Sequence, residues 1–87
     1  MIKVLIERHI AIDLGDHYQR AARHILQTAM QSRGFISGES LKNSSDSNHR
    51  LIIASYDNIA NWHLWLHSEQ RESLMQELRP MLKTDEK

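Results

Sequence analysis

The sequence of 87 residues predicts a small α+β domain with the order strand, helix, strand, strand, helix. Apolar and polar residues alternate near the start, which is the period of a strand with one buried face. Two segments repeat their apolar residues every three or four positions, as an amphipathic helix does. Between them, two short strand-like segments flank a polar turn cluster, as in a β-hairpin. The order is that of a ferredoxin-like fold whose last strand is missing or very short.

Residues 2–12 are expected to form the first strand. Because side chains alternate between the two faces of a strand, one face is apolar and the other, which includes Leu5 and Ala11, is mixed. A sheet with helices on one face and a partner on the other would need such a mixed face. The apolar face holds Ile2, Val4, Ile6, Ile10 and Ile12, and the mixed face also holds Lys3, Glu7 and His9.

The first helix is expected after the turn Asp13–Asp16. Either aspartate could accept a hydrogen bond from the free N–H groups of the first helical turn. We expect Gly34 to end this helix, because glycine readily adopts the left-handed conformation found just past a helix end. The apolar stripe is Tyr18, Ala21, Ala22, Ile25, Leu26, Ala29 and Met30, and the solvent face holds Arg20, Arg23, Gln27 and Gln31.

Residues 35–42 and 51–56 are expected to pair as a hairpin through the polar turn at 43–48. A second helical region begins at Asn58 and breaks at Ser68, whose side chain can cap the restarted helix. The apolar face of this region continues through Leu74, Leu78 and Leu82. No final strand follows, which predicts an open sheet edge.

We expect a single domain over residues 1–87, ending in a polar tail at 83–87. A domain of this size buries a small share of its surface, and such domains often gain stability by association, so we expect a homodimer. The sequence contains no cysteine, which excludes disulfides, a thiol nucleophile and thiolate metal sites.

The charge balance and the hydropathy of the chain argue against a nucleic-acid-binding, a membrane-spanning and a secreted protein. Eleven basic and eleven acidic side chains balance, so no basic surplus is present to neutralise the phosphates of a nucleic acid. No apolar run is long enough to cross a bilayer. Charges interrupt what would be the apolar core of a signal peptide in residues 1–8. We therefore expect a cytoplasmic protein that binds neither nucleic acid nor a membrane.

Two segments resemble the antibiotic biosynthesis monooxygenase-like family: residues 34–41, GFISGESL, and residues 62–71, WHLWLHSEQR. The resemblance extends over nearly the whole chain. It implies a dimeric α+β barrel, in which two sheets pack face to face and each monomer holds a pocket between its sheet and helices. Some members of the family oxidise quinols or anthrone-like polyketides with O₂ and no added cofactor, and others degrade haem. One fold hosts many chemistries, so the resemblance predicts the fold better than the reaction.

Asn61 and Trp65 lie four residues apart and share a helical face. Cofactor-free members of the family resemble this arrangement, with an asparagine and a tryptophan lining the pocket. An amide donor can stabilise the oxyanion of a dihydroxyaromatic substrate while that anion passes an electron to O₂. An indole can position a flat ring or donate a hydrogen bond. The alternative is that Trp65 only packs in the core and Asn61 only lies near the helix start.

Four other residues are candidates for the site. Tyr56 could donate a hydrogen bond in the pocket or simply pack, and Trp62 would lie in the site, at a dimer seam or at the core edge. Arg71 could pair with a substrate carboxylate or phenolate, or form a solvated ion pair. His9, beside Glu7, could accept a proton, because imidazole titrates near neutral pH.

Haem and metal sites are less well supported. Haem-degrading members carry an axial histidine about ten residues after the tryptophan, where this sequence has Met75, and they carry an asparagine in the first strand that is absent here. His63 and His67 are spaced to bring two imidazoles onto one metal. Two ligands do not make a site, and Asp57 and Glu69 only loosely complete one. We expect no metal and no cofactor.

The sequence therefore favours a cofactor-independent monooxygenase, an oxidoreductase acting on a planar aromatic or quinol-type small molecule. The expected catalytic residues are Asn61, Trp65 and His9, and the expected substrate-binding residues are Tyr56, Trp62 and Arg71. The alternative is a non-catalytic ligand-binding or interaction domain of the same fold. Two absences favour that alternative: the last strand, and the arginine that cofactor-free members carry in it.

Overall fold

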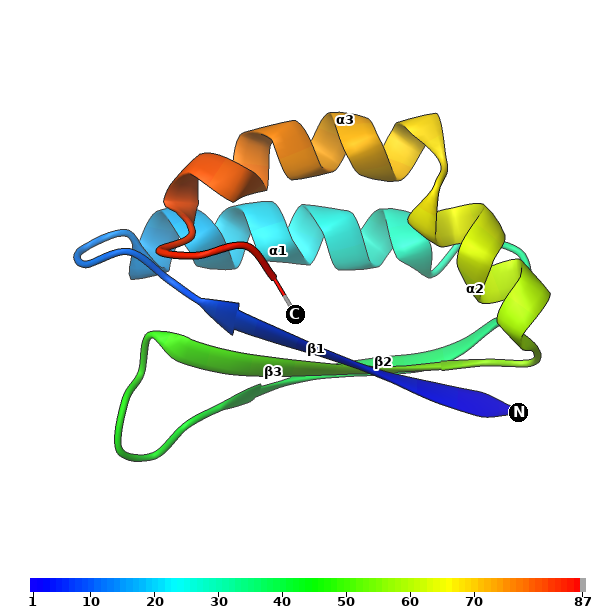
Figure 1. Ribbon diagram of the computed structural model, residues 1–87, viewed down its shortest axis with the longest axis horizontal. Coiled ribbons are helices and arrows are strands. Elements are labelled where there is room, and N and C mark those ends of the chain that lie inside the picture. The colour runs from blue at the N-terminus through cyan, green and yellow to red at the C-terminus, as the bar shows by residue number, and fades with distance from the viewer. Residues whose placement is uncertain (87) are drawn as a thin grey trace.

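Three antiparallel strands and three α-helices form two layers in the computed structural model, which describes residues 1–86 (Figure 1). The strands pair in the order β1-β3-β2, and the helices lie together on one face of the sheet. The strands are β1 (Ile2–His9), β2 (Phe35–Lys42) and β3 (His49–Tyr56). The helices are α1 (Gly15–Ala29), α2 (Ile59–Leu66), α3 (Glu69–Leu78) and the short 3-10 helix η1 (Arg79–Met81). This arrangement confirms the predicted α+β, ferredoxin-like class.

Strand β1 ends earlier than the sequence predicts. Only Ile10 continues the pairing beyond His9, through an isolated bridge to Leu82. The sequence places Ile12 on the apolar face, but its side chain is 81% exposed. The reason is that Ile12 lies in a turn, which is closed by the hydrogen bond from Leu14 N–H to the Ala11 carbonyl at 3.2 Å and contains Asp13 with φ of 67°.

Helix α1 lies where it is expected, but the predicted ends are wrong. Neither Asp13 nor Asp16 caps it, because Leu14 occupies the N-cap position and no side chain bonds there. Asp16 lies in the first turn instead, where its charge interacts favourably with the helix dipole. The helix ends well before Gly34, and Met30 is exposed because it follows the last helical residue. The rest of the apolar stripe faces the core as predicted.

Gly34 has a different role from the predicted one. Its φ of +82° lies in the region that favours glycine. A Cβ atom at this position would lie 2.2 Å from Asp57 Oδ1 and 2.6 Å from Asn61 Nδ2. The glycine therefore allows the start of β2 to approach the start of α2 closely.

The hairpin and the second helical region confirm the predictions. Strands β2 and β3 pair in antiparallel register, with a bulge between Phe35 and Ser37. The Asn58 side chain accepts a hydrogen bond from the backbone N–H of Asn61 at the start of α2. The Ser68 side chain does the same for Arg71 at the start of α3. Both short helices are thus fixed by side-chain caps.

No fourth strand is present within residues 1–86, but the segment after η1 runs beside the end of β1. The backbone N–H of Ala11 donates to Met81 at 2.9 Å, and that of Lys83 donates to His9 at 2.7 Å. The predicted polar tail at 83–87 is not simply solvated, because Glu86 folds back against the interior. Lys87 lies outside the described residues.

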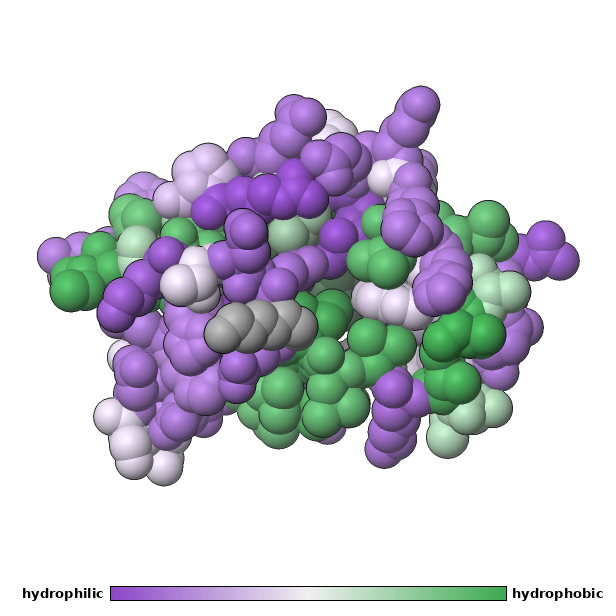
Figure 2. Space-filling view, viewed as in Figure 1, coloured by the Kyte–Doolittle hydropathy of each residue, from purple (hydrophilic) through white to green (hydrophobic). Residues whose placement is uncertain are grey.

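The outer face of the sheet carries no helix (Figure 1). Leu5 and Leu41 on this face are 59% and 46% exposed, and Leu51 and Ile53 beside them are half-buried. Figure 2 shows hydrophobic residues gathering over the sheet and around α2, whereas the surface of α3 is mainly hydrophilic. The core itself lies between the sheet and the helices, where Tyr18, Tyr56, Met75 and Leu78 are fully buried.

Candidate functional site

A cavity of about 180 Å³ lies between the inner face of the sheet and the helices. An engineered cavity of roughly 150 Å³ holds benzene, so this space is large enough to admit an aromatic ring. The lining is mainly apolar and comes from all three strands and all three helices. Four aromatic side chains contribute to it: Phe35, Tyr56, Trp62 and Trp65.

Tyr56 is the centre of the aromatic wall. Its ring makes edge contacts with Phe35 and Trp62, with centroids 5.7 and 5.5 Å apart. Its hydroxyl lies 2.7 Å from Ser32 Oγ. Burial raises the pKa of Tyr56 above its usual value, although the hydrogen bond with Ser32 and the charge of Arg71 act in the opposite direction. Tyr56 is therefore a neutral phenol that can donate a hydrogen bond rather than act as a base.

Two buried arginines also line the cavity. Arg8 comes from β1 and is 4% exposed, and Arg71 comes from the first turn of α3 and is 5% exposed. Arg8 Nη1 donates to the hydroxyl of Tyr18 at 3.2 Å. The alternative of a solvated ion pair for Arg71 does not hold, because its guanidinium is enclosed by the protein.

Glu86 joins the two arginines. Arg8 Nε donates to Glu86 Oε2 at 2.9 Å, and Arg71 Nη2 donates to Glu86 Oε1. Burial opposes the ionisation of Glu86, but the hydrogen bonds and charges of Arg71 and Arg8 outweigh it and lower the pKa of the carboxyl below its usual value. Glu86 is therefore a carboxylate that bridges two elements of the cavity wall.

A third buried arginine, Arg50 of β3, lies beside this group. Its guanidinium carbon is 5.4 Å from the centre of the Tyr18 ring. Its nitrogens donate to Gln19 Oε1 at 3.0 Å and to the backbone oxygen of Ser47 at 2.8 Å. These partners are neutral, so they do not compensate the charge of Arg50.

Asn61 does not line the cavity in this structure. Its side-chain nitrogen donates to Asp57 Oδ1 at 2.8 Å, which directs the amide toward the loop before α2. Trp65, four residues later, is 5% exposed and does line the cavity. Trp62 is also buried within this chain, in the core and the cavity wall.

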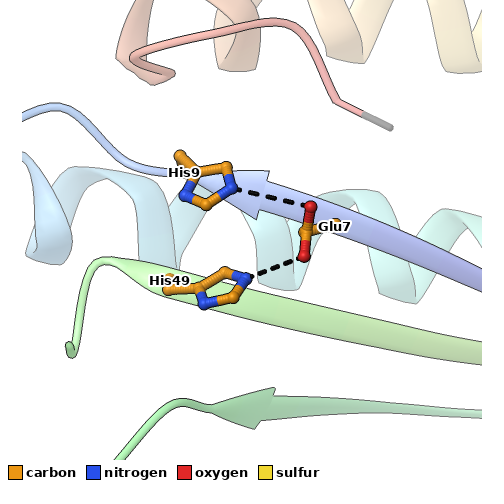
Figure 3. A group of neighbouring side chains, drawn as sticks. All are labelled: Glu7, His9 and His49. Carbon is orange, nitrogen blue, oxygen red and sulfur yellow. Dashed lines mark hydrogen bonds and ion pairs between the residues drawn. The ribbon is translucent and has the colours of Figure 1, made fainter. Parts of the chain in front are cut away.

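His9 lies on the outer face of the sheet and does not line the cavity. It stacks on His49, its direct partner across β1 and β3, with ring centroids 4.5 Å apart and planes at 11° (Figure 3). Glu7 contacts both rings, at 3.0 Å from His49 Nε2 and 3.6 Å from His9 Nε2. The hydrogen bond from His49 lowers the pKa of Glu7 below its usual value; desolvation acts in the opposite direction, and the charges of His49 and His9 add to the lowering.

The nitrogen and carboxylate donors of Glu7, His9 and His49 lie within 4.8 Å of one another and are of the types that Zn²⁺ binds. Lone pairs of the two stacked rings lie in nearly parallel planes, so they do not converge on one ion without a ring rotation. A cross-strand ion pair accounts for the observed geometry. Within residues 1–86, no third acidic, histidine or cysteine ligand joins His63 and His67.

Sequence reasoning thus identified four residues of the cavity wall, Tyr56, Trp62, Trp65 and Arg71. It missed Arg8, Arg50 and Glu86. A signal for Arg8 was present, because it occupies an even position among the apolar residues of the first strand. Glu86 carried no such signal, since an isolated acidic residue in a polar segment is usually solvated.

In the part of the chain that the structure describes, no helix has the length and apolar character needed to cross a membrane.

The sequence matches the family model for antibiotic biosynthesis monooxygenase over residues 1–77. It has no match among curated protein sequences. Solved structures resemble the fold closely at low sequence identity. A candidate antibiotic biosynthesis monooxygenase from Deinococcus radiodurans is 22% identical with a TM-score of 0.89, and the match covers 100% of this chain and 86% of that one.

Two further structures give the same result. SnoaB, a cofactor-independent oxygenase from Streptomyces nogalater, is 12% identical with a TM-score of 0.85, covering 98% of this chain and 87% of that one. Another antibiotic biosynthesis monooxygenase is 16% identical with a TM-score of 0.89, covering 100% and 92%. Identities this low show a shared fold, and the family model covers most of the chain. The chain therefore belongs to the antibiotic biosynthesis monooxygenase family.

Proposed function

We propose that the protein is a cofactor-independent monooxygenase that oxidises a planar aromatic or quinol-type small molecule in the cavity between its sheet and helices. The composition of the cavity wall carries the proposal, because the wall combines aromatic side chains with buried guanidinium groups. A flat ring can pack against Trp65 and Phe35. A nearby cation favours the ionised form of a hydroxyl on that ring. Membership of the family and the similarity to a cofactor-independent oxygenase support the same reaction class.

The reaction needs an electron-rich anion and O₂. With an anthrone-type substrate, the ionised ring gives one electron to O₂, and the resulting radical and superoxide combine to form a C–O bond. Loss of water from the hydroperoxide then leaves a carbonyl group. The ring carbon is oxidised from CH₂ to C=O, a loss of four electrons, and O₂ gains four electrons. One oxygen atom enters the product and the other leaves as water, so the reaction requires no external reductant.

The side chains of the cavity have separate roles in this proposal. Trp65 positions the ring of the substrate. Tyr56 gives up its hydrogen bond with Ser32 and donates one to an oxygen on that ring instead. Asn61 reaches the substrate oxygen only after releasing Asp57, so we expect its amide to turn when the ligand binds. His9 lies on the opposite face of the sheet, so the proposal assigns the stabilisation of the substrate anion to the buried arginines.

We further propose that the protein acts as a homodimer whose subunits pack through the outer faces of their sheets. The exposed side chains of Leu5 and Leu41, with Leu51 and Ile53 beside them, support this surface. Contiguous apolar side chains on the uncovered face of a sheet are typical of an interaction surface. Strand β1 lies at one edge of the sheet, and the bridge between Ile10 and Leu82 lies just past its last residue. The free edge of β1 would then lie at the border of the dimer interface.

A second candidate function is a non-catalytic ligand-binding domain. The hydrogen bond of Asn61 to Asp57 favours it, because this contact withdraws the expected oxyanion donor from the cavity. A binding domain and an enzyme would both bind a planar ligand. Only the enzyme would consume O₂ with it.

The test is an oxygen-uptake assay with purified protein in air, without added cofactor, against a panel of anthrones and aromatic quinols. We expect stoichiometric conversion of one class to the carbonyl product and at least a tenfold loss of rate in Trp65→Ala. His63→Ala is the matched control, because His63 is an exposed residue of the same helix. Full activity in Trp65→Ala would exclude the cavity as the catalytic site. Ligand binding without oxygen uptake across the panel would favour the second candidate function.

A further inference from the structure

The contact of Glu86 with Arg8 and Arg71 resembles the way a protein holds a bound carboxylate. Each carboxylate oxygen accepts from a different guanidinium, and the two arginines come from β1 and α3, which are far apart in the sequence. Both arginines are more than nine-tenths buried, whereas the Glu86 side chain is 21% exposed. Guanidinium groups that converge on two carboxylate oxygens form strong, directional hydrogen bonds.

The buried group carries a surplus of positive charge. Three arginines, Arg8, Arg50 and Arg71, are buried, and within residues 1–86 Glu86 is the carboxylate that forms ion pairs with Arg8 and Arg71, while Arg50 has only neutral hydrogen-bond partners. Glu39 lines the same cavity but is exposed to solvent. Buried charges are costly unless they are compensated, so this region favours an additional or a replacement anion. The surplus is local, because the whole chain has a formal net charge of zero.

Glu86 is held mainly by its side chain. The last backbone hydrogen bond of its segment is the one from Lys83 to His9, and residues 84–86 make none within the described part of the chain. In Figure 1 the chain after η1 runs back toward β1 as a coil. An incoming carboxylate can therefore replace Glu86 without disrupting a strand or a helix.

We propose that Arg8 and Arg71 form a carboxylate-binding site in the cavity wall, which Glu86 occupies until the carboxylate of a planar aromatic acid displaces it. The same two arginines line the cavity beside Trp65 and Tyr56, so one ligand can place its ring on the aromatic wall and its carboxylate on the guanidinium groups. This site rests on the cavity being the substrate site of the proposed oxygenase, and it narrows the substrate class to aromatic acids. Glu86 sets the selectivity, because a neutral ligand gains nothing from displacing it.

The test compares 2-naphthoate with 2-naphthamide, its neutral analogue of nearly the same shape, by titration of tryptophan fluorescence. The wild-type protein is expected to bind the carboxylate about tenfold more tightly than the amide, a difference of about 1.4 kcal/mol. Glu86→Gln is expected to tighten carboxylate binding about tenfold and to leave amide binding unchanged. Glu77→Gln is the matched control, because Glu77 is an exposed glutamate of α3. Arg71→Gln is expected to abolish the preference for the carboxylate.

Each outcome separates this inference from the proposed function. Equal binding of the two probes, with no effect of Glu86→Gln, would overturn the carboxylate site and leave the cavity as a ligand site. No binding of either probe would overturn both proposals. The expected binding pattern without oxygen uptake by any carboxylated quinol would support the carboxylate site and count against the oxygenase. If Arg71→Gln fails to fold, as judged by circular dichroism, the result for Glu86→Gln alone decides the matter.

Discussion

Gly34→Ala should be one of the most destabilising small substitutions in this chain. The backbone at this position has φ of +82°, and forcing an L-residue into that region costs about 1–2 kcal/mol. The new Cβ would also lie 2.8 Å from Asn61 Cβ and 2.2 Å from Asp57 Oδ1. The start of α2 must then shift, and the hydrogen bond between Asn61 and Asp57 is lost, at about 0.5–1.5 kcal/mol.

These two terms sum to roughly 1.5–3.5 kcal/mol, a large part of the stability of a domain of this size. Since about 1 kcal/mol shifts the Tm of such a domain by roughly 4–8 °C, we expect Gly34→Ala to lower the Tm by at least about 6 °C. Gly15→Ala is the matched control. A Cβ at Gly15 meets nothing within 4 Å, and the residue begins α1, so alanine should be neutral or slightly stabilising.

Urea unfolding followed by circular dichroism measures both variants on the same scale. Loss of the Asn61 contact should also change the quenching of Trp62 and Trp65 fluorescence, since both lie on the same helix. A Gly34→Ala variant as stable as Gly15→Ala would refute the close packing of β2 against α2. It would also remove the structural reason for the observed orientation of Asn61.

Two other predictions concern the charges and the outer sheet face. Because the pKa of Glu86 is lowered in the folded protein, its ion pairs stabilise the fold above the ordinary carboxyl pKa of 4.5, and this contribution is lost as the pH falls through the lower folded value. The Tm of Glu86→Gln should therefore fall less steeply than that of the wild type below about pH 4.5, and parallel curves would contradict the ion pairs. Leu5→Glu places a charge on the outer face of the sheet, so if this face forms the proposed dimer, sedimentation velocity should show a dimer for the wild type and a monomer for the variant. An unchanged sedimentation coefficient would exclude this face as the interface.

Local patterns predicted the elements of this fold where the signal was strong. The alternation in β1, the three-and-four spacing in α1 and the polar turn between β2 and β3 each produced the predicted element. The predictions were wrong at the ends of helices and strands, because tertiary contacts determine where an element ends. Gly34 shows this clearly: its positive φ is as expected of glycine, but α1 already ends at Ala29, and Gly34 instead leaves the space that Asp57 and Asn61 occupy.

The site was harder to predict because its key contacts join distant segments. Spacing along α2 placed Asn61 and Trp65 on one helical face, but of these two only Trp65 lines the cavity. The same spacing could not show that Asn61 bonds to Asp57, because both partners are polar and either could face solvent. The position of Arg8 is more instructive. An arginine at an even position among apolar residues contradicts the pattern of its strand, and local contradictions of this kind often mark functional sites.

A charged residue on the buried face of a strand requires a partner, and the partner defines what the site can bind. For Arg8 and Arg71 that partner is Glu86, which lies 78 residues from Arg8 in the sequence. A hydrophobic pair in these positions would often serve stability as well or better, because burying ion pairs yields little net stabilisation. Retaining two guanidinium groups beside an aromatic cavity is therefore better explained by recognition of an anion than by stability. On that reasoning, the pairing of Glu86 with the arginines and the binding of substrate compete for the same hydrogen bonds.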